Sequence, residues 1–234
     1  MCAERRAEIV WESERCLVVA KPWGVPVFPP HADPGGDCVL RRLLVARPEQ
    51  SGEWPAGFSG GIAHRLDIPT SGQLLVAKTA ADLAWLRGLF AARRLTKTYE
   101  LLTAKDPPWN SHTITASLAH DRRKRSRMVV QRGRNTPHRG RWLPAETRFA
   151  RQERCGSLWR WEAVMQTGIM HQIRAHAGFA GLALAGDRLY GGGAPPEGFP
   201  VPFALHHVGL VGPDLAPDPV PPPEWWSLVG RDPM

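Results

Sequence analysis

The chain has 234 residues, a formal net charge of +8 at pH 7 and an isoelectric point near 9.9. This length suffices for one large domain with a sizeable core, and the excess of Lys and Arg favours a polyanionic partner because cations that neutralise phosphates release counterions. The sequence has no apolar run of about 18 residues and no Cys-x-x-Cys pair, which excludes a membrane-spanning helix and a zinc or disulfide framework. We therefore expect a soluble, cytoplasmic protein with free thiols.

The first part of the chain predicts a small set of strands and one helix. Apolar runs at residues 9–11 and 16–20 predict two strands joined by a polar turn. Two prolines and a glycine at residues 21–27 predict irregular backbone. Residues 39–45 have helical apolar spacing, and we expect this helix to end before Pro48.

A loop at residues 60–72 contains several candidate catalytic side chains close together in the sequence. Its glycines free the backbone, and Pro69 excludes regular helix or strand through its middle. His64, Arg65 and Asp67 are therefore displayed on a turn, where Asp67 could serve as a nucleophile or a general base. The same pattern also fits an Asx turn in which the carboxylate only accepts hydrogen bonds from backbone amides.

A strand, a helix and a second strand are predicted after this loop. An apolar run at residues 74–78 predicts a strand, and Thr79 or Asp82 can cap the amphipathic helix that follows. Residues 96–103 are rich in strand formers, so the side chains at positions 97 and 99 share one face of a strand. A tyrosine on such a face is usually part of the core.

The most basic segment lies at residues 121–141. Concentrated positive charge repels itself, and a bound polyanion would relieve the repulsion; a solvated loop of biased composition is the alternative. We assign RNA phosphate contacts to this segment. Its leading cations are Arg122, Arg123, Lys124, Arg125 and Arg127.

The last third of the sequence predicts a strand at residues 159–165 and a short helix that Thr167 can cap. Most of the ten tryptophans are expected in or over the core, with base stacking as the alternative. The predicted helix places His171 and Arg174 three positions apart on neighbouring surface. No Cys or carboxylate group stands at ligand spacing near these residues, so we predict no metal site.

Two long strings resemble the RluA family of pseudouridine synthases. HRLDIPTSGQLLVAK at residues 64–78 is similar to the first motif of the family, and TGIMHQIRAH at residues 167–176 is similar to its third motif. Shorter strings, Lys-Pro-x-Gly at residues 21–24 and Lys-x-Tyr at residues 97–99, occur in the family order. The resemblance covers residues 16–210.

The resemblance implies a mixed α/β (α+β) architecture, the pseudouridine synthase fold. This fold has a bent, largely antiparallel sheet, flanking helices and a central cleft. The expected organisation is a single catalytic domain at residues 1–211 and a Pro-rich strap or tail at residues 212–234. We expect a monomer.

The implied activity is isomerisation of a specific uridine in ribosomal or transfer RNA to pseudouridine, without a cofactor. Asp67 would be the catalytic residue, Tyr99 would lie against the base, and Arg174 would pair with Asp67. Arg65 is the family's candidate for filling the space that a flipped nucleotide leaves. The remaining substrate contacts, besides the basic segment, are expected from His64, Thr70, Lys97 and His171.

The sequence departs from the family at two places, and other functions stay open. Gln73 replaces an apolar residue, which concerns packing, and Ile169 and Met170 replace an Arg-Thr pair, which concerns the affinity for substrate or its identity. An RNA-binding or assembly protein with weak or no catalysis is the main alternative. A Ser/His/Asp hydrolase using Ser71 is a further one, although the sequence lacks a Gly-x-Ser-x-Gly elbow.

Overall fold

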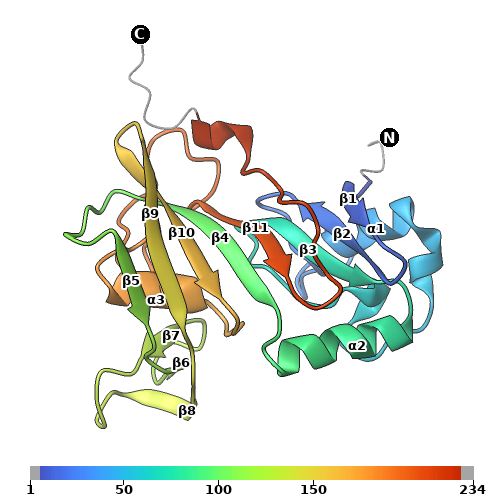
Figure 1. Cartoon of the computed structure of the whole chain (residues 1–234), viewed down its shortest axis with the longest axis horizontal. Helices are drawn as coiled ribbons and strands as arrows, with labels where there is room; N and C mark the ends of the chain where they lie inside the picture. The colour runs from blue at the N-terminus through green and yellow to red at the C-terminus, as the bar shows by residue number, and fades with distance from the viewer. Residues whose placement is uncertain (1–5, 228–234) are drawn as a thin grey trace. The chain divides into compact units, whose positions relative to one another are not determined.

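The computed structural model describes residues 6–227, which divide into two compact units. The first unit comprises the chain up to Thr96 together with His206–Pro222, and the second comprises Lys97–Leu205 together with the chain from Pro223 (Figure 1). Cys2 and the last seven residues of the predicted tail lie outside the described residues.

The first unit contains one four-stranded arrangement in the order β1-β2-β3-β11. Its members are β1 (Ile9–Glu12), β2 (Cys16–Lys21), β3 (Ser71–Ala77) and β11 (Leu205–Val211). β2 is antiparallel to β1 and β3, whereas β11 is parallel to β3. β3 begins three residues before the predicted strand because Gly72 and Gln73 already pair with β2. The candidate loop therefore leads directly into the sheet.

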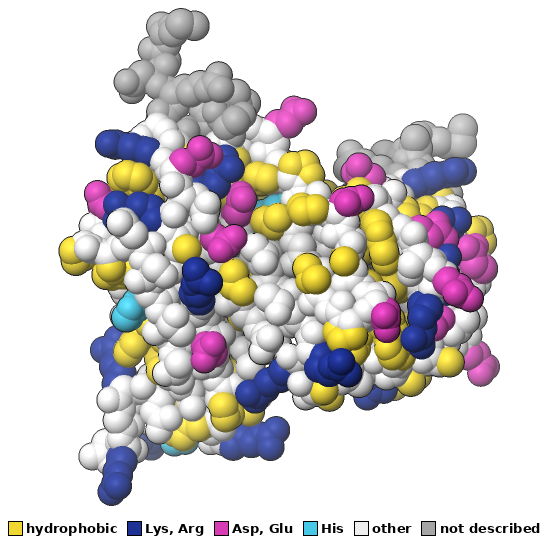
Figure 2. Space-filling view, in the orientation of Figure 1, with side chains coloured by type: hydrophobic (Ala, Val, Ile, Leu, Met, Phe, Trp, Pro, Cys, Tyr) yellow, Lys and Arg dark blue, Asp and Glu magenta, His cyan; other side chains and the backbone are white. Residues whose placement is uncertain are grey.

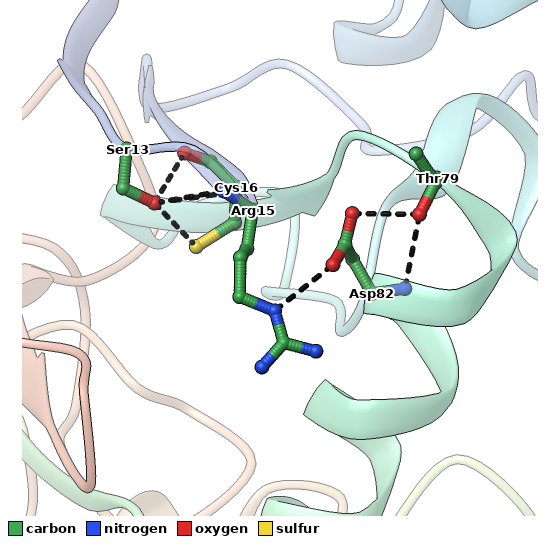
Figure 3. Close-up of polar contacts among 5 residues, drawn as sticks. All are labelled: Ser13, Arg15, Cys16, Thr79 and Asp82. Atoms are coloured by element: carbon green, nitrogen blue, oxygen red, sulfur yellow. Dashed lines mark hydrogen bonds and ion pairs between the residues drawn. The ribbon is translucent and has the colours of Figure 1, made fainter.

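Two helices cover the first unit, α1 (Val39–Ala46) and α2 (Ala80–Ala91), together with the short turns η1 (Pro48–Ser51) and η2 (Ser59–Gly61). The hydroxyl of Thr79 accepts the Asp82 N–H at 3.2 Å, which confirms Thr79 as the helix cap. Arg15, in the turn before β2, donates through Nε to the Asp82 carboxylate at 3.0 Å (Figure 3). This ion pair fastens the start of α2 to the β1–β2 turn.

The apolar face of α2 forms the core of the first unit with the sheet. Leu83, Leu86 and Leu89 pack in one buried cluster with Val18 and Leu75. All five side chains are buried, so the helical spacing in the sequence and the strand pattern meet at one interface.

The second unit contains two groups of strands and one helix (Figure 1). Four antiparallel strands run in the order β4-β10-β9-β5: β4 (Thr96–Thr103), β10 (Leu158–Met165), β9 (Thr147–Cys155) and β5 (Ser111–Ile114). A separate three-stranded sheet has the order β7-β6-β8: β7 (Met128–Val130), β6 (Leu118–Asp121) and β8 (His138–Leu143). The helix is α3 (Gln172–Phe179), and η3 (Glu224–Ser227) is a short terminal turn.

Apolar side chains of the second unit form buried clusters. Leu118, Met128 and Val130 of the three-stranded sheet pack with Ala175 of α3. Trp226 belongs to the other cluster, and Trp161 of β10 is fully buried as well, so the core interpretation is confirmed for these two tryptophans. Mixed α/β structure with mostly antiparallel pairing agrees with the predicted fold class.

The Pro-rich segment at residues 212–222 is bonded to the sheet of the first unit. Val220 donates its N–H to the Val208 carbonyl of β11 at 2.8 Å, and Leu215 is buried in the core cluster around α2. We refer to residues 212–222 below as the strap. The division into a catalytic domain at 1–211 and a tail at 212–234 stays a prediction.

Candidate active site

The loop that carries Asp67 ends in a tight turn. The carbonyl of Asp67 accepts the Thr70 N–H at 3.0 Å, and the carbonyl of Ile68 accepts the Gly24 N–H at 2.9 Å. Asp67 is half-buried, Arg65 is exposed, and Thr70 is buried. The turn holds the Asp67 carboxylate near the start of β3.

A buried lysine donates hydrogen bonds to the backbone of this turn. The Lys21 ammonium donates to the backbone carbonyls of Thr70 at 2.6 Å, Pro22 at 3.0 Å and Ile68 at 3.1 Å, and only 1% of the residue is exposed. Burial lowers the pKa of Lys21 to about 7, and the charge of Asp67 opposes that shift. Three acceptors match the three N–H donors of an ammonium, so the charged lysine joins two carbonyls of the turn to the carbonyl of Pro22.

Lys21 lies in the Lys-Pro-x-Gly string, and the sequence pattern assigns it no structural or catalytic role. A signal was available, because a lysine at the end of the apolar strand Cys16–Lys21 is a buried charge that needs acceptors.

His64 has a structural contact in the first unit. Its Nε2 accepts the Leu75 N–H at 3.1 Å, and its ring lies 5.5 Å from the Phe90 ring and 5.8 Å from the His207 ring, between centroids. Accepting a backbone amide requires an unprotonated Nε2, so the neutral ring carries its proton on Nδ1. The substrate contacts expected from His64, Arg65 and Thr70 stay predictions.

Ser71 and His206 form a buried pair, which bears on the hydrolase alternative. Nε2 of His206 lies 2.8 Å from the Val220 carbonyl and must donate to it, so Nδ1 accepts the Ser71 hydroxyl at 2.9 Å. Burial lowers the pKa of His206 to about 4, although the hydrogen bond to Val220 opposes the shift. A weakly basic imidazole oriented by a carbonyl, beside a serine 3% exposed, is a structural pair and not a hydrolase site.

Gln73 joins three segments of the first unit. Its fully buried side chain accepts the Leu210 N–H of β11 at 3.2 Å and donates to the Asp218 carbonyl of the strap at 2.7 Å. The polar residue at this normally apolar position thus has a specific bonding role, and it fastens the strap beside the loop of Asp67.

In the second unit, Lys97 and Tyr99 occupy the same face of β4, as predicted. Both are buried, at 4% and 6% exposed, and they stand opposite Met165 and Ala163 of β10. Burial lowers the pKa of Lys97 to about 8. The roles of Tyr99 against a base and of Lys97 as a substrate contact stay predictions.

Arg174 lies on α3 and is bound by a carboxylate that sequence reasoning did not select. Its Nε donates to Oδ2 of Asp187 at 2.7 Å and its Nη2 to Oδ1 at 3.0 Å. Asp187 lies outside the string at residues 167–176, and its distance of 13 residues from Arg174 exceeds any helical spacing. The sequence signal was therefore a charge in an apolar stretch, with no indication of its partner.

The start of α3 differs from the prediction. The helix begins at Gln172, with His171 as the preceding residue at a φ of 55°, and Thr167 does not cap it. The residues before the helix form a turn of their own, because Ile169 accepts the Gln172 N–H and donates to the Gln172 side chain. His171 and Arg174 are nevertheless three positions apart, as expected.

His171 contacts Tyr190, which also binds the basic hairpin. The Tyr190 hydroxyl accepts the Met128 N–H at 2.9 Å and lies 3.0 Å from Nδ1 of His171. Burial raises the pKa of Tyr190 to about 12, so the hydroxyl stays protonated and can donate to that nitrogen. Ile169, at the position where the resemblance leads one to expect Arg, packs against the buried cluster that contains Leu118 and Met128, as Tyr190 does.

His176 is buried and uses both ring nitrogens. Nε2 lies 2.9 Å from the Ala116 carbonyl, and Nδ1 lies 2.9 Å from the Thr147 hydroxyl. Burial lowers the pKa of His176, which the bond to Ala116 opposes, and the ring is neutral at pH 7. Within residues 6–227 no group of three metal-ligating side chains comes together.

The basic segment forms a hairpin. Oδ1 of Asp121 accepts the N–H groups of Arg123 at 2.7 Å and Lys124 at 3.1 Å, which shapes the β6–β7 turn. Residues 122–127 are all exposed. Figure 2 shows Lys and Arg side chains gathered at the end of the molecule where β6, β7 and β8 lie. The hairpin thus exposes its cations to solvent on a hydrogen-bonded turn, where they are accessible to an anion.

The predicted catalytic residues fall into both units. Asp67 belongs to the first, and Tyr99 and Arg174 belong to the second. Each side chain has a defined local environment, and the pairing of Asp67 with Arg174 stays a prediction.

Comparison with known proteins first identifies the fold and then the family. The solved structure of Human RNA Pseudouridylate Synthase Domain Containing 1 matches 96% of this chain and 86% of its own, with a TM-score of 0.72 and 23% identity. A model of the RNA pseudouridylate synthase family matches residues 15–178. The chain belongs to this family, and the predicted RluA type is confirmed.

Curated relatives support the assignment. Ribosomal large subunit pseudouridine synthase D of Yersinia pestis is 32% identical over 192 residues, 82% of this chain and 55% of that protein. An uncharacterized RNA pseudouridine synthase of Chloroflexus aurantiacus is 36% identical over 174 residues, 73% of this chain and 50% of that protein. The chain spans about half the length of these relatives. Among the described residues, no helix has the length and apolar character needed to cross a membrane.

Proposed function

We propose that the chain is an RNA pseudouridine synthase with Asp67 as its catalytic residue. The observation that carries the proposal is the family match over residues 15–178, which contains Asp67, Tyr99 and Arg174. The turn of Asp67 is held by the buried Lys21, which gives the carboxylate a defined place on its unit.

The chemistry of the reaction suits these residues. The glycosidic N–C bond breaks, the uracil turns while bound, and its carbon 5 bonds to the sugar. Positive charge develops near the glycosidic carbon during cleavage, and the Asp67 carboxylate would stabilise it. Arg174 would keep that carboxylate ionised and oriented, and Tyr99 would help remove the proton from carbon 5.

RNA would be held by the basic hairpin and by residues of the loop. The target atoms are inaccessible in a base stack, so the nucleotide must be flipped out at a cost of a few kcal/mol. The exposed Arg65 stands two residues from Asp67, where it would fill the vacated space. Lys97 and His171 would contact the flipped nucleotide or its neighbours.

The substrate is proposed to be ribosomal or transfer RNA in the cytoplasm. Both curated relatives compared above carry pseudouridine synthase names; one name specifies RNA and the other the large ribosomal subunit. The exposed cations at residues 122–127 fit any structured RNA. We propose that the enzyme acts as a monomer.

The test is an Asp67→Asn variant assayed on RNA from cells that lack the gene. Wild-type protein should form pseudouridine, detected by mass spectrometry of RNA digests, and the variant should form none while it still binds the RNA. Glu53→Gln is the matched control, because Glu53 is an exposed acid of the same unit. Full activity of Asp67→Asn would overturn the assignment. Wild-type protein that binds RNA without modifying it would indicate an RNA-binding or assembly function.

A further inference from the structure

The ion pair between Arg174 and Asp187 is deeply buried in the second unit. The side chains are 9% and 1% exposed, and both carboxylate oxygens bind the guanidinium, at 2.7 Å and 3.0 Å. A bidentate pair of this kind fixes the plane of a guanidinium as well as its position.

Two aromatic rings restrict the guanidinium further. Cζ of Arg174 lies 4.3 Å from the centroid of the Phe203 ring and 5.1 Å from that of the Tyr190 ring. Stacking contacts of this type add attraction and leave less room for the side chain to turn. Arg174 therefore has one defined orientation within its unit.

The carboxylate is held as firmly as the arginine. Oδ1 of Asp187 also accepts the Leu189 N–H at 3.2 Å. The Asp187 carbonyl accepts the N–H groups of Tyr190 at 3.1 Å and Gly192 at 2.8 Å. A Cβ at Gly192 would lie 1.7 Å from the Leu184 carbonyl oxygen, so this tight turn requires a glycine there. The backbone thus presents the carboxylate in a fixed direction.

We propose that Asp187 is a positioning residue that aims Arg174 at the reaction centre. Asp187 binds the edge of the guanidinium formed by Nε and Nη2, so the direction in which Nη1 points is set by this bond. The proposal rests on the proposed function, in which Arg174 orients the catalytic carboxylate. It also implies that Arg174 acts through aimed N–H donors more than through net charge, because Asp187 balances its charge locally.

The first test compares Asp187→Asn with wild type in steady-state pseudouridine formation. We expect kcat to fall roughly ten- to a hundredfold with little change in KM, since a small misplacement of an orienting group has an effect of this size. Asp82→Asn is the matched control, because it removes a carboxylate bonded to an arginine at 3.0 Å in the other unit. Asp187→Asn should lose more melting temperature than Asp82→Asn, because the side chains of its ion pair are 9% and 1% exposed against 42% and 13% in the control, and the control should keep its kcat.

A double-mutant cycle separates positioning from a general structural role. If Asp187 acts through Arg174, Asp187→Asn should have no further effect on kcat in an Arg174→Lys background. Wild-type kcat in the single variant, or decreases that multiply in the double variant, would overturn the proposal.

The positioning of Arg174 by Asp187 can also be measured without the activity assay, by NMR. The Nε–H resonance of Arg174, assigned by its disappearance in Arg174→Lys, should exchange slowly with solvent in wild type and rapidly in Asp187→Asn. Unchanged exchange would overturn the positioning role. If wild-type protein forms no pseudouridine, the proposed function fails, and this resonance alone decides whether Asp187 positions Arg174.

A second variant covers the case in which Asp187→Asn does not fold. Asp187→Glu keeps the charge but displaces the carboxylate by one methylene group, so a lower kcat with unchanged KM is again expected. A Glu variant with wild-type kcat would overturn the proposal.

Discussion

At the scale of single residues, the unusual group is a lysine whose three donors are all used by the backbone. Lys21 binds the carbonyls of Ile68 and Thr70 in the Asp67 turn and is almost fully buried. Because burial disfavours the charged form, this interaction has a cost at acid and neutral pH that a surface lysine does not have.

The free energy of unfolding should therefore depend on pH through Lys21. Its pKa is about 7 in the folded state and near 10.5 ordinarily, so between these values the unfolded state binds more protons. The free energy of unfolding should rise with pH in this window by up to about 1.4 kcal/mol per unit. In Lys21→Met the part of this rise that Lys21 contributes should be missing, whereas Lys97, with a pKa of about 8, should contribute equally in both proteins; denaturant unfolding at pH 7, 8 and 9 measures the difference.

The exposed Lys105 provides the control for this pH dependence. Lys105→Met should keep the slope of wild type. Parallel pH slopes in wild type and Lys21→Met would contradict the low pKa of Lys21.

At the scale of elements, the three-stranded sheet holds a turn whose cations are exposed to solvent. Asp121 shapes the turn, Tyr190 binds the Met128 N–H, and the cations between them face solvent. Like charges held on a rigid turn repel each other more than on a flexible loop, and a bound phosphate backbone relieves the repulsion.

Neutralising the turn should weaken RNA binding in a salt-dependent way. The quadruple variant replaces the exposed Arg122, Arg123, Lys124 and Arg125 with glutamine and leaves Asp121 in place. Its affinity for RNA should fall, and the slope of log affinity against log salt should shrink by up to about 0.7 for each phosphate that the variant no longer neutralises. Filter binding over a range of salt concentrations measures both quantities.

The control for the hairpin changes the same net charge elsewhere. Four exposed arginines of the first unit are replaced with glutamine: Arg41, Arg87, Arg93 and Arg94. A salt slope that falls equally in both variants would show that only net charge matters and would contradict a specific role of the hairpin.

At the scale of the whole molecule, segments distant in sequence are joined around the candidate loop. Gln73 bonds to Leu210 and to Asp218, which are 137 and 145 positions away. His206 similarly connects Ser71 of β3 to Val220 of the strap. The strap is thus tied to the strand that follows the candidate catalytic loop.

Restoring the apolar residue usual in the family should loosen this connection. In Gln73→Leu the N–H of the buried Leu210 loses its acceptor, and an unsatisfied buried donor costs about 1 to 3 kcal/mol. We expect the free energy of unfolding to fall by this amount in chemical denaturation. Gln152→Leu, at an exposed position of β9, is the control, and equal stabilities of the two variants would contradict the bonding role of Gln73.

The local order of elements and the family were predictable from the sequence. Apolar spacing placed α2, with Thr79 or Asp82 as its cap, and alternation placed Lys97 and Tyr99 on one face of a strand. These features depend on neighbours a few positions apart, which is the range over which helical and strand periodicity act. The strings around Asp67 and Arg174 led to the family that the comparisons show.

The partners of the buried charged and polar groups were decided only by the tertiary structure. Lys21 binds a turn 49 positions away, Gln73 binds the strap, and Asp187, in the loop after α3, binds Arg174 13 positions away. Sequence periodicity does not predict such pairs. A buried charge requires a hydrogen-bond partner, but the pattern does not specify where in the chain that partner lies. The sequence by itself thus determined the family and indicated the candidate catalytic groups, and the fold decided which groups hold them.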